Sequence, residues 1–436
     1  METKGIQQFM NSYSVKMMVV MGLALVLLIP SILIQEIIGE RIEQSGKVKA
    51  ELYAQWGGEQ VVSGPVLNVP YSVHEAAEGN KPASVRQGIA HFLPETLEAD
   101  GELLPEKRKR SIYSVMVYEG KLRLSGNFAA PEVSRLDLAN ATYHWKSAYF
   151  TVGITDMRGI KNLPVLVINQ DPLVAEPGVA DNDLFASGLT FPSASVDPTS
   201  PMLFDIELIL NGSENLSIEV LGKTTEIKMR SPWSDPTFTG AYLPDYREVT
   251  AEGFSAAWKV THLNRNFPQQ WADSKYNTRE ALVGVGLLIQ VDHYLKSMRS
   301  AKYAILFIAL NFIVFLFIEL KSKTRIHPFQ YTLVALALLL FYALLTSLGE
   351  QIGFNLAYGI SAVLITALIS WYANSIVRNK RTIGSITLVQ AGLYTFLFVI
   401  LQLQEFALLA GSAGLFVILA IIMRASQKIV WYNDGR

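Results

Sequence analysis

The chain of 436 residues contains no cysteine, which excludes a disulfide framework, a thiolate metal site and a thiol nucleophile. Charged residues are also scarce, at 17% of the sequence, whereas soluble domains carry about 25%. The formal net charge is only -1, and no basic tract is interleaved with aromatic residues. We therefore expect no binding to nucleic acid.

Recognisable catalytic motifs are missing as well. The sequence has no GxSxG elbow and no P-loop, and the GVG at 284–286 lacks the third glycine of a dinucleotide fingerprint. Four histidines are scattered without an HExxH motif or a close pair: His74, His91, His144 and His262. Distant strands could still assemble a zinc site, but ordinary surface or core roles are favoured. We predict no catalytic residue, no cofactor and no metal site, and hence a non-enzymatic protein.

Half of the residues are hydrophobic, and they gather in long runs. A bilayer core about 30 Å thick requires roughly 20 apolar residues in a helix. The first run, within 17–38, exceeds the length of a signal-peptide core and no small-x-small cleavage site follows, so we interpret it as a retained transmembrane helix. Five more runs within 301–423 predict a five-helix transmembrane bundle: 303–320, 331–348, 354–375, 384–402 and 406–423.

The loops between these runs predict an orientation, because short loops rich in Lys and Arg stay in the cytoplasm. Cations fill 321–330 and 376–383 and follow the last run, whereas the opposite loops, GEQIG and QLQE, contain none. Residues 1–16 and the tail 424–436 are therefore expected in the cytoplasm. Residues 39–300 are expected on the other side, since long domains cross largely regardless of their charge.

Residues 39–300 alternate between apolar and polar side chains after an amphipathic stretch near 39–56. The segments SIYSVMVY, KLRLSGNF, FDIELILNG, NLSIEVLG and TTEIKMRS all show this period of two, which is typical of half-buried antiparallel strands. We predict a large β-rich, antiparallel, sandwich-like domain outside the cytoplasm. Together with the helices, this makes the fold class an α+β membrane protein.

Turn signals divide this β-rich region. SIYSVMVY and KLRLSGNF read as a hairpin with Glu119-Gly120 at its turn, and Asn211-Gly212 is a second turn signal. The stretch 171–203, rich in Pro, Gly, Ser and Asp, is interpreted as the longest irregular connection. It would be the boundary if the domain has two lobes.

The predicted spans carry no ionisable residue at mid-depth, where ion pathways usually keep one. Only Asn311, Gln390 and Tyr394 lie deep, and we interpret them as hydrogen-bonding groups between helices. Pumping of ions is therefore not expected, although a pathway for a lipid would leave little trace in the sequence. Small residues spaced by four in 354–375 and 406–423 let helices approach closely, either within one chain or between chains of a homo-oligomer.

The stretch VDHYLKSMRSAKYAILF, residues 291–307, marks the return of the chain to the membrane. It gathers six candidate residues of a joint between domain and membrane: Asp292, His293, Lys296, Arg299, Lys302 and Tyr303. Plain anchoring by snorkelling cations would explain them. The sharper hypothesis is that Asp292 caps a helix and that Arg299 or Lys302 reaches an outer-loop acid, Glu350 or Glu405.

Several segments resemble the CreD family of bacterial inner-membrane proteins, also called cell envelope integrity proteins. They include GPVLNVPY, ITDMRGI, MRSPWSDPTFTGAYLP, LNRNFPQQW, VDHYLKSMRSAKYAILFIALNF and IHPFQYTLVALALLLFYALLTSLGEQIGF. The likeness covers nearly the whole chain, including the order of one span, a large domain and five spans. Departures are local: Ser111 stands where a glycine is expected, Asn311 where a threonine is usual, and QLQEFALLAGSAGLF where the family more often shows an acidic pair before the ALL.

The resemblance implies a multi-pass protein of the inner membrane that acts in the envelope stress response, but it implies no reaction and no catalytic residue. We therefore expect a non-enzymatic protein that lies in the lipid bilayer and binds an envelope component or a periplasmic protein through its large domain. The alternative is a transporter or processing protein for a lipid or glycan-lipid, with the same domain as its receptor.

Overall fold

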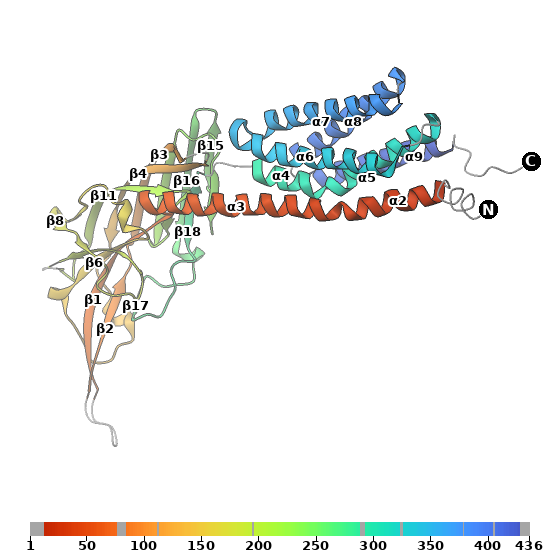
Figure 1. The fold of residues 1–436 in the computed structure, drawn as a ribbon. Helices are drawn as coiled ribbons and strands as arrows, with labels where there is room; N and C mark the ends of the chain where they lie inside the picture. The colour runs from red at the N-terminus through yellow and green to blue at the C-terminus, as the bar shows by residue number, and fades with distance from the viewer. Residues whose placement is uncertain are drawn as a thin grey trace, which may run out of the picture. The chain divides into compact units, whose positions relative to one another are not determined.

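The computed structural model describes residues 13–75, 84–110, 113–193, 196–287, 293–322, 326–377, 379–403 and 406–427. The chain divides into two compact units, a helical unit of Met1–Gly46 with Gln290–Arg436 and a β-rich unit of Lys47–Ile289. The predicted fold class is confirmed, because an apolar N-terminal helix, a large β-rich domain and C-terminal helices of membrane-span length are all present (Figure 1).

Two helices in succession carry the first apolar run, α2 (Tyr13–Val26) and α3 (Leu28–Trp56). Backbone hydrogen bonds to and from Leu27 continue the turn between them. The break lies just before Pro30, which has no N–H to donate to the preceding turn. The helix does not end with the apolar run near residue 38 but continues through the amphipathic stretch to Trp56.

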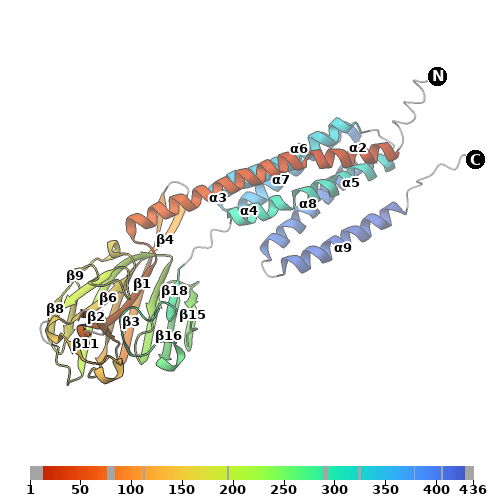
Figure 2. The same ribbon diagram turned by 90° about the horizontal axis from the view of Figure 1, so that it is seen from below.

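The β-rich unit contains two sheets (Figure 2). One is ten-stranded, with the main order β14-β18-β12-β1-β6-β10-β9 and with β2, β5 and β17 beside it. Its strands are β1 (Gln60–Glu75), β2 (Ser84–Phe92), β5 (Ala141–Tyr143), β6 (Tyr149–Ile154), β9 (Glu176–Pro177), β10 (Gly188–Pro192), β12 (Asn215–Glu219), β14 (Thr237–Gly240), β17 (Gln270–Ala272) and β18 (Leu282–Gly286).

The other sheet is eight-stranded, in the order β15-β16-β13-β3-β4-β11-β7-β8. Its strands are β3 (Thr96–Arg110), β4 (Tyr113–Phe128), β7 (Val165–Ile168), β8 (Asp171–Val174), β11 (Met202–Ser213), β13 (Thr224–Ser231), β15 (Tyr246–Thr250) and β16 (Gly253–Thr261). Alternate side chains along β3 and β11 are buried, as their period of two predicts. Both sheets contribute to one hydrophobic core, which includes Tyr118, Phe128, Phe150 and Phe191.

The predicted hairpin at Glu119-Gly120 is wrong. Strand β4 runs unbroken through both residues, and its antiparallel neighbour is β3, which pairs with it from Thr96 to Arg110. Gly120 lies opposite Leu103 on β3 and Leu210 on β11, inside the sheet. A glycine after an acid resembles a turn in sequence, but here neighbouring strands on both sides hold the backbone extended.

The predicted turn at Asn211-Gly212 is also wrong, because β11 continues to Ser213. The chain turns one residue later at Glu214, which has a positive φ of 58°. A Cβ on Gly212 would lie 2.3 Å from the Tyr118 hydroxyl oxygen. This glycine therefore makes room for a buried ring on the adjacent strand instead of a turn.

Most strand pairs are antiparallel, as expected, but β1 pairs with β12 in parallel and β13 pairs with β3 in parallel. Both pairs join segments far apart in the sequence, so local alternation carries no information about their direction. The stretch 171–203, predicted as irregular, contains β8, β9, β10 and the start of β11. These strands belong to both sheets.

Six helices form the C-terminal part of the helical unit: α4 (His293–Lys302), α5 (Ala304–Ser322), α6 (Pro328–Ile352), α7 (Phe354–Val377), α8 (Lys380–Gln402) and α9 (Ala407–Ser426). Helices α4 and α5 are bent by 48° about the break at Tyr303. In the described part of the chain, five helices are long and apolar enough to cross a membrane, or six if this bent pair forms one span. Helix α6 packs against α7, α4 and α5.

Candidate functional site

Helix α4 carries most of the residues predicted for the joint. Tyr294, Ser297 and Ser300 are buried on one of its faces. The Tyr294 hydroxyl donates a hydrogen bond of 3.0 Å to Oε1 of Glu350 in the last turn of α6, and Nε of Arg41 on α3 lies 3.9 Å from the same oxygen. The carboxylate of Glu350 thus joins three helices of the helical unit.

The cations of α4 have other surroundings. Lys296 Nζ lies 3.5 Å from the side-chain oxygen of Gln402 and 5.8 Å from the centre of the Phe354 ring. Neither Arg299 nor Lys302 has a carboxylate within 4.0 Å among the described residues. Asp292 and Glu405 lie outside those residues, so the ionic joint stays a prediction.

The two remaining joint residues lie at the ends of α4. The His293 ring centre is 4.1 Å from that of Tyr294. Tyr303 is 41% exposed and lies at the bend between α4 and α5. Arg41 and Tyr294 were missed from the sequence, because their meeting with Glu350 depends on how α3, α4 and α6 pack.

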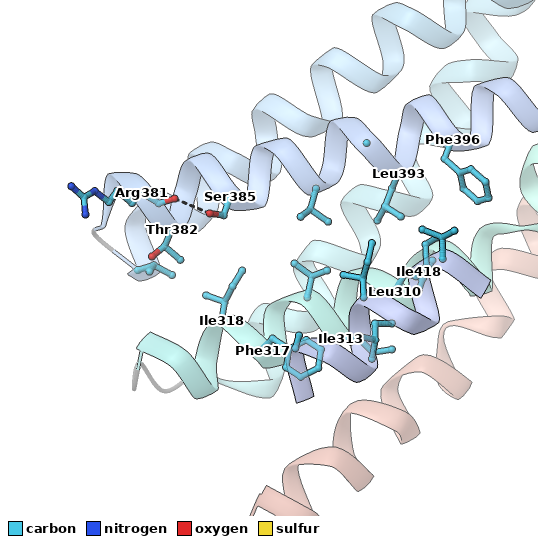
Figure 3. A pocket seen from close by; sticks show the side chains of 18 of the residues that line it. Leu310, Ile313, Phe317, Ile318, Arg381, Thr382, Ser385, Leu393, Phe396 and Ile418 are labelled. Carbon is cyan, nitrogen blue, oxygen red and sulfur yellow. Dashed lines mark hydrogen bonds between the residues drawn. The ribbon is translucent and has the colours of Figure 1, made fainter. Parts of the chain in front are cut away.

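A groove of about 1000 Å³ lies between α5, α8 and α9 in the helical unit (Figure 3). Its walls are almost entirely apolar: Leu310, Ile313 and Phe317 come from α5, Leu393 and Phe396 from α8, and Ile418 from α9. Helix α9 has no buried residue among those described, because it touches α8 over a short length only. The volume lies at the upper end of the range for small-molecule sites.

One end of the groove is polar. The N-cap residue Asn379 lines it together with Arg381, Thr382 and Ser385 from the first two turns of α8. The Arg381 side chain points outward from the apolar walls (Figure 3). The Asn379 side chain caps this helix by accepting a hydrogen bond of 3.0 Å from the backbone N–H of Arg381. The N-terminus of a helix carries a partial positive charge, and Arg381 adds a full one, so this end favours an anionic group.

A polar layer crosses the bundle beside the groove. Asn311 on α5 donates to the Phe307 carbonyl at 2.8 Å and accepts a hydrogen bond from Gln390 on α8. The Tyr358 hydroxyl donates to the Tyr394 carbonyl at 2.7 Å, which ties α7 to α8. The Asn311–Gln390 bond agrees with the hydrogen-bonding role expected for the deep polar residues, whereas the Tyr394 hydroxyl is buried without a hydrogen-bond partner among the described residues.

The fold and the groove define an integral membrane protein with a β-rich domain and a helical bundle that contains an apolar groove with a cationic end. The family model described as "Inner membrane protein CreD" matches residues 12–432. "Inner membrane protein CreD" of Escherichia coli (strain K12) is 31% identical over 423 residues, which cover 96% of this chain and 93% of that protein. The chain therefore belongs to the CreD family of inner membrane proteins.

Among solved structures, an M1 zinc metallopeptidase mutant from Deinococcus radiodurans, bound to a Tyr-Ser-Ala substrate, matches with a TM-score of 0.20 and 10% identity. The match covers 45% of this chain and 42% of that chain. A similarity this low says nothing about the fold or the activity.

Proposed function

We propose that this CreD-family protein supports envelope integrity by holding an anionic membrane lipid in the groove between α5, α8 and α9, without catalysing a reaction. The observation that carries the proposal is the groove itself, which combines apolar walls with a cationic end. Acyl chains match the walls, and a phosphate headgroup matches Arg381 and the start of α8. This geometry favours the lipid-handling alternative that the sequence left open.

The groove offers a matched pair of glycine substitutions. Gly392 lines the groove and Gly359 lies on α7 away from it, and an added Cβ meets no atom within 4 Å at either position. Gly392→Leu should therefore fill the groove without disturbing the fold, and Gly359→Leu serves as the control. Both helices keep their backbone, so a difference between the variants reports on the groove.

The measurement is native mass spectrometry of the full-length protein after delipidation and incubation with phosphatidylglycerol or phosphatidylethanolamine. Gly392→Leu should lower the retained lipid several-fold relative to Gly359→Leu. Arg381→Gln should lower retention of phosphatidylglycerol but not of phosphatidylethanolamine, whereas Lys380→Gln should change neither. Equal retention in Gly392→Leu and Gly359→Leu would refute a lipid in the groove.

The proposal also requires the cationic end of the groove to face the cytoplasm. The cations of 376–383 support this orientation. Because the chain has no cysteine, Lys380→Cys and Leu163→Cys each introduce one thiol, and Leu163 is 93% exposed in the β-rich unit. In intact spheroplasts an impermeant maleimide should label position 163 only. Labelling of position 380 but not of position 163 would show that the topology is the opposite of the one predicted.

A second binding role, for a partner protein, is favoured by the edge of the eight-stranded sheet. All five residues of β15 are exposed, and the strand pairs only with β16 among the described strands. Tyr246 and Val249 are apolar and 56% and 47% exposed. An unpaired edge of this kind accepts an extended segment of another protein.

Photo-crosslinking in cells tests this edge. A benzoylphenylalanine at Tyr246 should give a protein adduct, whereas one at Leu203, which is 66% exposed but lies on the inner strand β11, should not. Adducts of equal yield at both positions, or none at either, would remove the case for a partner at β15.

A further inference from the structure

Three potential metal ligands converge in the β-rich unit. His91 lies on β2, and Asp181 and Asp183 lie in the loop between β9 and β10. A ring nitrogen of His91 and one carboxylate oxygen from each aspartate all lie within 4.8 Å of one another, and Nε2 is 3.8 Å from Oδ2 of Asp183. His91 is only 1% exposed, so this is an imidazole inside the sandwich facing two acids at its rim.

The hydrogen bonds around His91 determine which ring nitrogen is free. Its Nδ1 atom lies 2.7 Å from Oδ1 of Asn68. The Asn68 amide group donates to the Val66 carbonyl at 3.2 Å and to Oγ1 of Thr151 at 2.9 Å, which leaves Oδ1 as an acceptor. Nδ1 therefore carries the proton, and Nε2 presents a lone pair. Metal-binding histidines are typically held in this way.

The lone pair of Nε2 has no hydrogen-bond partner. Its nearest acid, Oδ2 of Asp183, is 3.8 Å away, which is too far for a hydrogen bond. Asp181 is in a similar state: Oδ1 accepts the backbone N–H of Asp183 at 3.2 Å, but Oδ2 is buried without a partner. Electron pairs of three groups thus face one another with no donor between them.

His91 and Asp181 line a cavity of about 10 Å³, close to the space that a single water molecule or ion requires. Asn68, Tyr149 and Thr151 complete its polar wall. A cation is the species that satisfies three converging lone pairs at once.

We propose that His91, Asp181 and Asp183 form a binding site for one divalent transition-metal ion. Zn²⁺ binds imidazole nitrogen and carboxylate oxygen at about 2.0–2.2 Å, which in a tetrahedral site leaves the ligand atoms roughly 3.4 Å apart. Atoms that lie within 4.8 Å of one another therefore need to draw together by up to about 1.5 Å. The partly exposed loop of Asp181 and Asp183 can make this movement. The imidazole favours Zn²⁺ over Ca²⁺ and Mg²⁺, which prefer all-oxygen sites.

The bound ion would fasten the loop between β9 and β10 to β2, and through Asn68 to β1. A natural reporter lies beside it, because the Trp271 ring centre is 5.7 Å from that of His91. A paramagnetic ion such as Co²⁺ at this site should quench the fluorescence of Trp271. The proposal concerns the β-rich unit alone and is independent of a lipid in the groove.

The test uses the full-length protein purified in detergent, stripped with EDTA and dialysed. Titration with Zn²⁺, followed by elemental analysis after gel filtration, should give about one ion per chain. His91→Gln and Asp181→Asn should abolish this stoichiometric binding, and Co²⁺ should no longer quench their fluorescence. Asn68→Ser should weaken Zn²⁺ binding by about 10- to 100-fold, because only the support of the imidazole is lost.

Matched controls are His74→Gln, an exposed histidine on β1, and Asp171→Asn, an exposed acid on β8. Both should bind Zn²⁺ as the unmodified chain does. Circular dichroism of every variant checks folding, and the metal content of the unmodified chain stands even if a variant fails to fold. The proposal is overturned if that chain retains no stoichiometric Zn²⁺, or if His91→Gln and His74→Gln bind it equally.

Discussion

The β-rich unit and the helical unit bury their side chains by different means. In the sandwich, aromatic rings from both sheets fill one core. The centre of the Phe128 ring lies 5.5 Å from that of Phe150 and 5.3 Å from that of Phe204. In the helical unit, α6 buries ten of its 25 residues while α9 buries nothing among its described residues. The hydrophobic effect in water favours burial of apolar side chains in the sandwich. Lipid tails are as apolar as leucine, so helices in a membrane associate through packing and hydrogen bonds instead.

Some glycines show the same contrast, although Gly414 of α9 departs from it, because a Cβ there would lie 2.0 Å from the Phe396 ring. A Cβ on Gly101 of β3 would lie 2.3 Å from the Met229 sulfur, whereas Gly359 and Gly392 in the helical unit have open space around them. The sandwich therefore has no space for one more carbon atom at such positions, while the bundle has space for side chains at parts of its surface. That room is where the groove lies.

The largest effect is expected from Phe150→Ala in the sandwich core. The ring is fully buried, so its loss should lower the free energy of unfolding by about 3–5 kcal/mol. Phe416→Ala on α9, where the ring is 74% exposed, should change it little in detergent. Chemical unfolding of the full-length protein, followed by tryptophan fluorescence, compares the two. Equal losses would contradict the contrast between the units.

Gly240→Ala should have the next largest effect. Gly240 has a φ of +101°, and a Cβ there would lie 2.2 Å from the Leu282 carbonyl oxygen. We expect a loss of at least about 1–3 kcal/mol. Gly359→Ala should instead be neutral or stabilising, by up to about 1 kcal/mol, because alanine favours a helix. Thermal unfolding midpoints that shift in the same direction for both variants would argue against this difference.

A buried acid makes the stability of the sandwich depend on pH. Glu219 on β12 is fully buried, and burial raises its pKa above the ordinary value of 4.5, although Arg279 and Arg265 nearby oppose the shift. The folded state therefore holds a proton that the unfolded state releases. Its stabilising contribution is complete below the unfolded pKa and is lost as pH rises through the folded pKa.

Glu219→Gln should remove this dependence, which has a slope of at most about 1.4 kcal/mol per pH unit. Unfolding measured from pH 4.5 upward should show a decline in the unmodified chain that is flatter in the variant. Glu207→Gln, at a position on the exposed face of β11, is the control and should leave the slope unchanged. A variant as steep as the unmodified chain would mean that Glu219 is ionised when folded.

The smallest effects are expected around Glu350 in the helical unit. Tyr294→Phe removes one hydrogen bond to a carboxylate and should cost about 1–2 kcal/mol. Arg41→Gln should cost no more than about 0.5 kcal/mol, because the pair is 3.9 Å apart and Arg41 is half-exposed. Thermal unfolding of the purified variants measures which substitution lowers the stability more. A larger loss for Arg41→Gln would make the ion pair, and not the hydrogen bond, the main contact of Glu350.

The sequence by itself determined the type of each region. Long apolar runs are sufficient for helices of membrane-span length, since a lipid-facing helix must be apolar whatever its neighbours are. Alternation along FDIELILNG and TTEIKMRS predicted strands correctly, because one face of each strand is buried. Periodicity and composition are local properties of the sequence. They are sufficient to predict a helix or strand when one face of that element is buried and the other is not.

Only the tertiary structure decided which elements meet. Glu119-Gly120 resembled a turn, but β3 and β11 on either side hold it extended. His91 resembled an ordinary scattered histidine until β2 and the loop after β9 brought Asp181 and Asp183 to it. The groove likewise exists because α9 packs loosely on α8. This loose packing cannot be predicted from the residues of either helix. Such sites join residues far apart in the sequence, such as His91 with Asp181 and Leu310 with Ile418. The physical reason is that long-range pairing is chosen by the packing of the whole core, which no local pattern encodes.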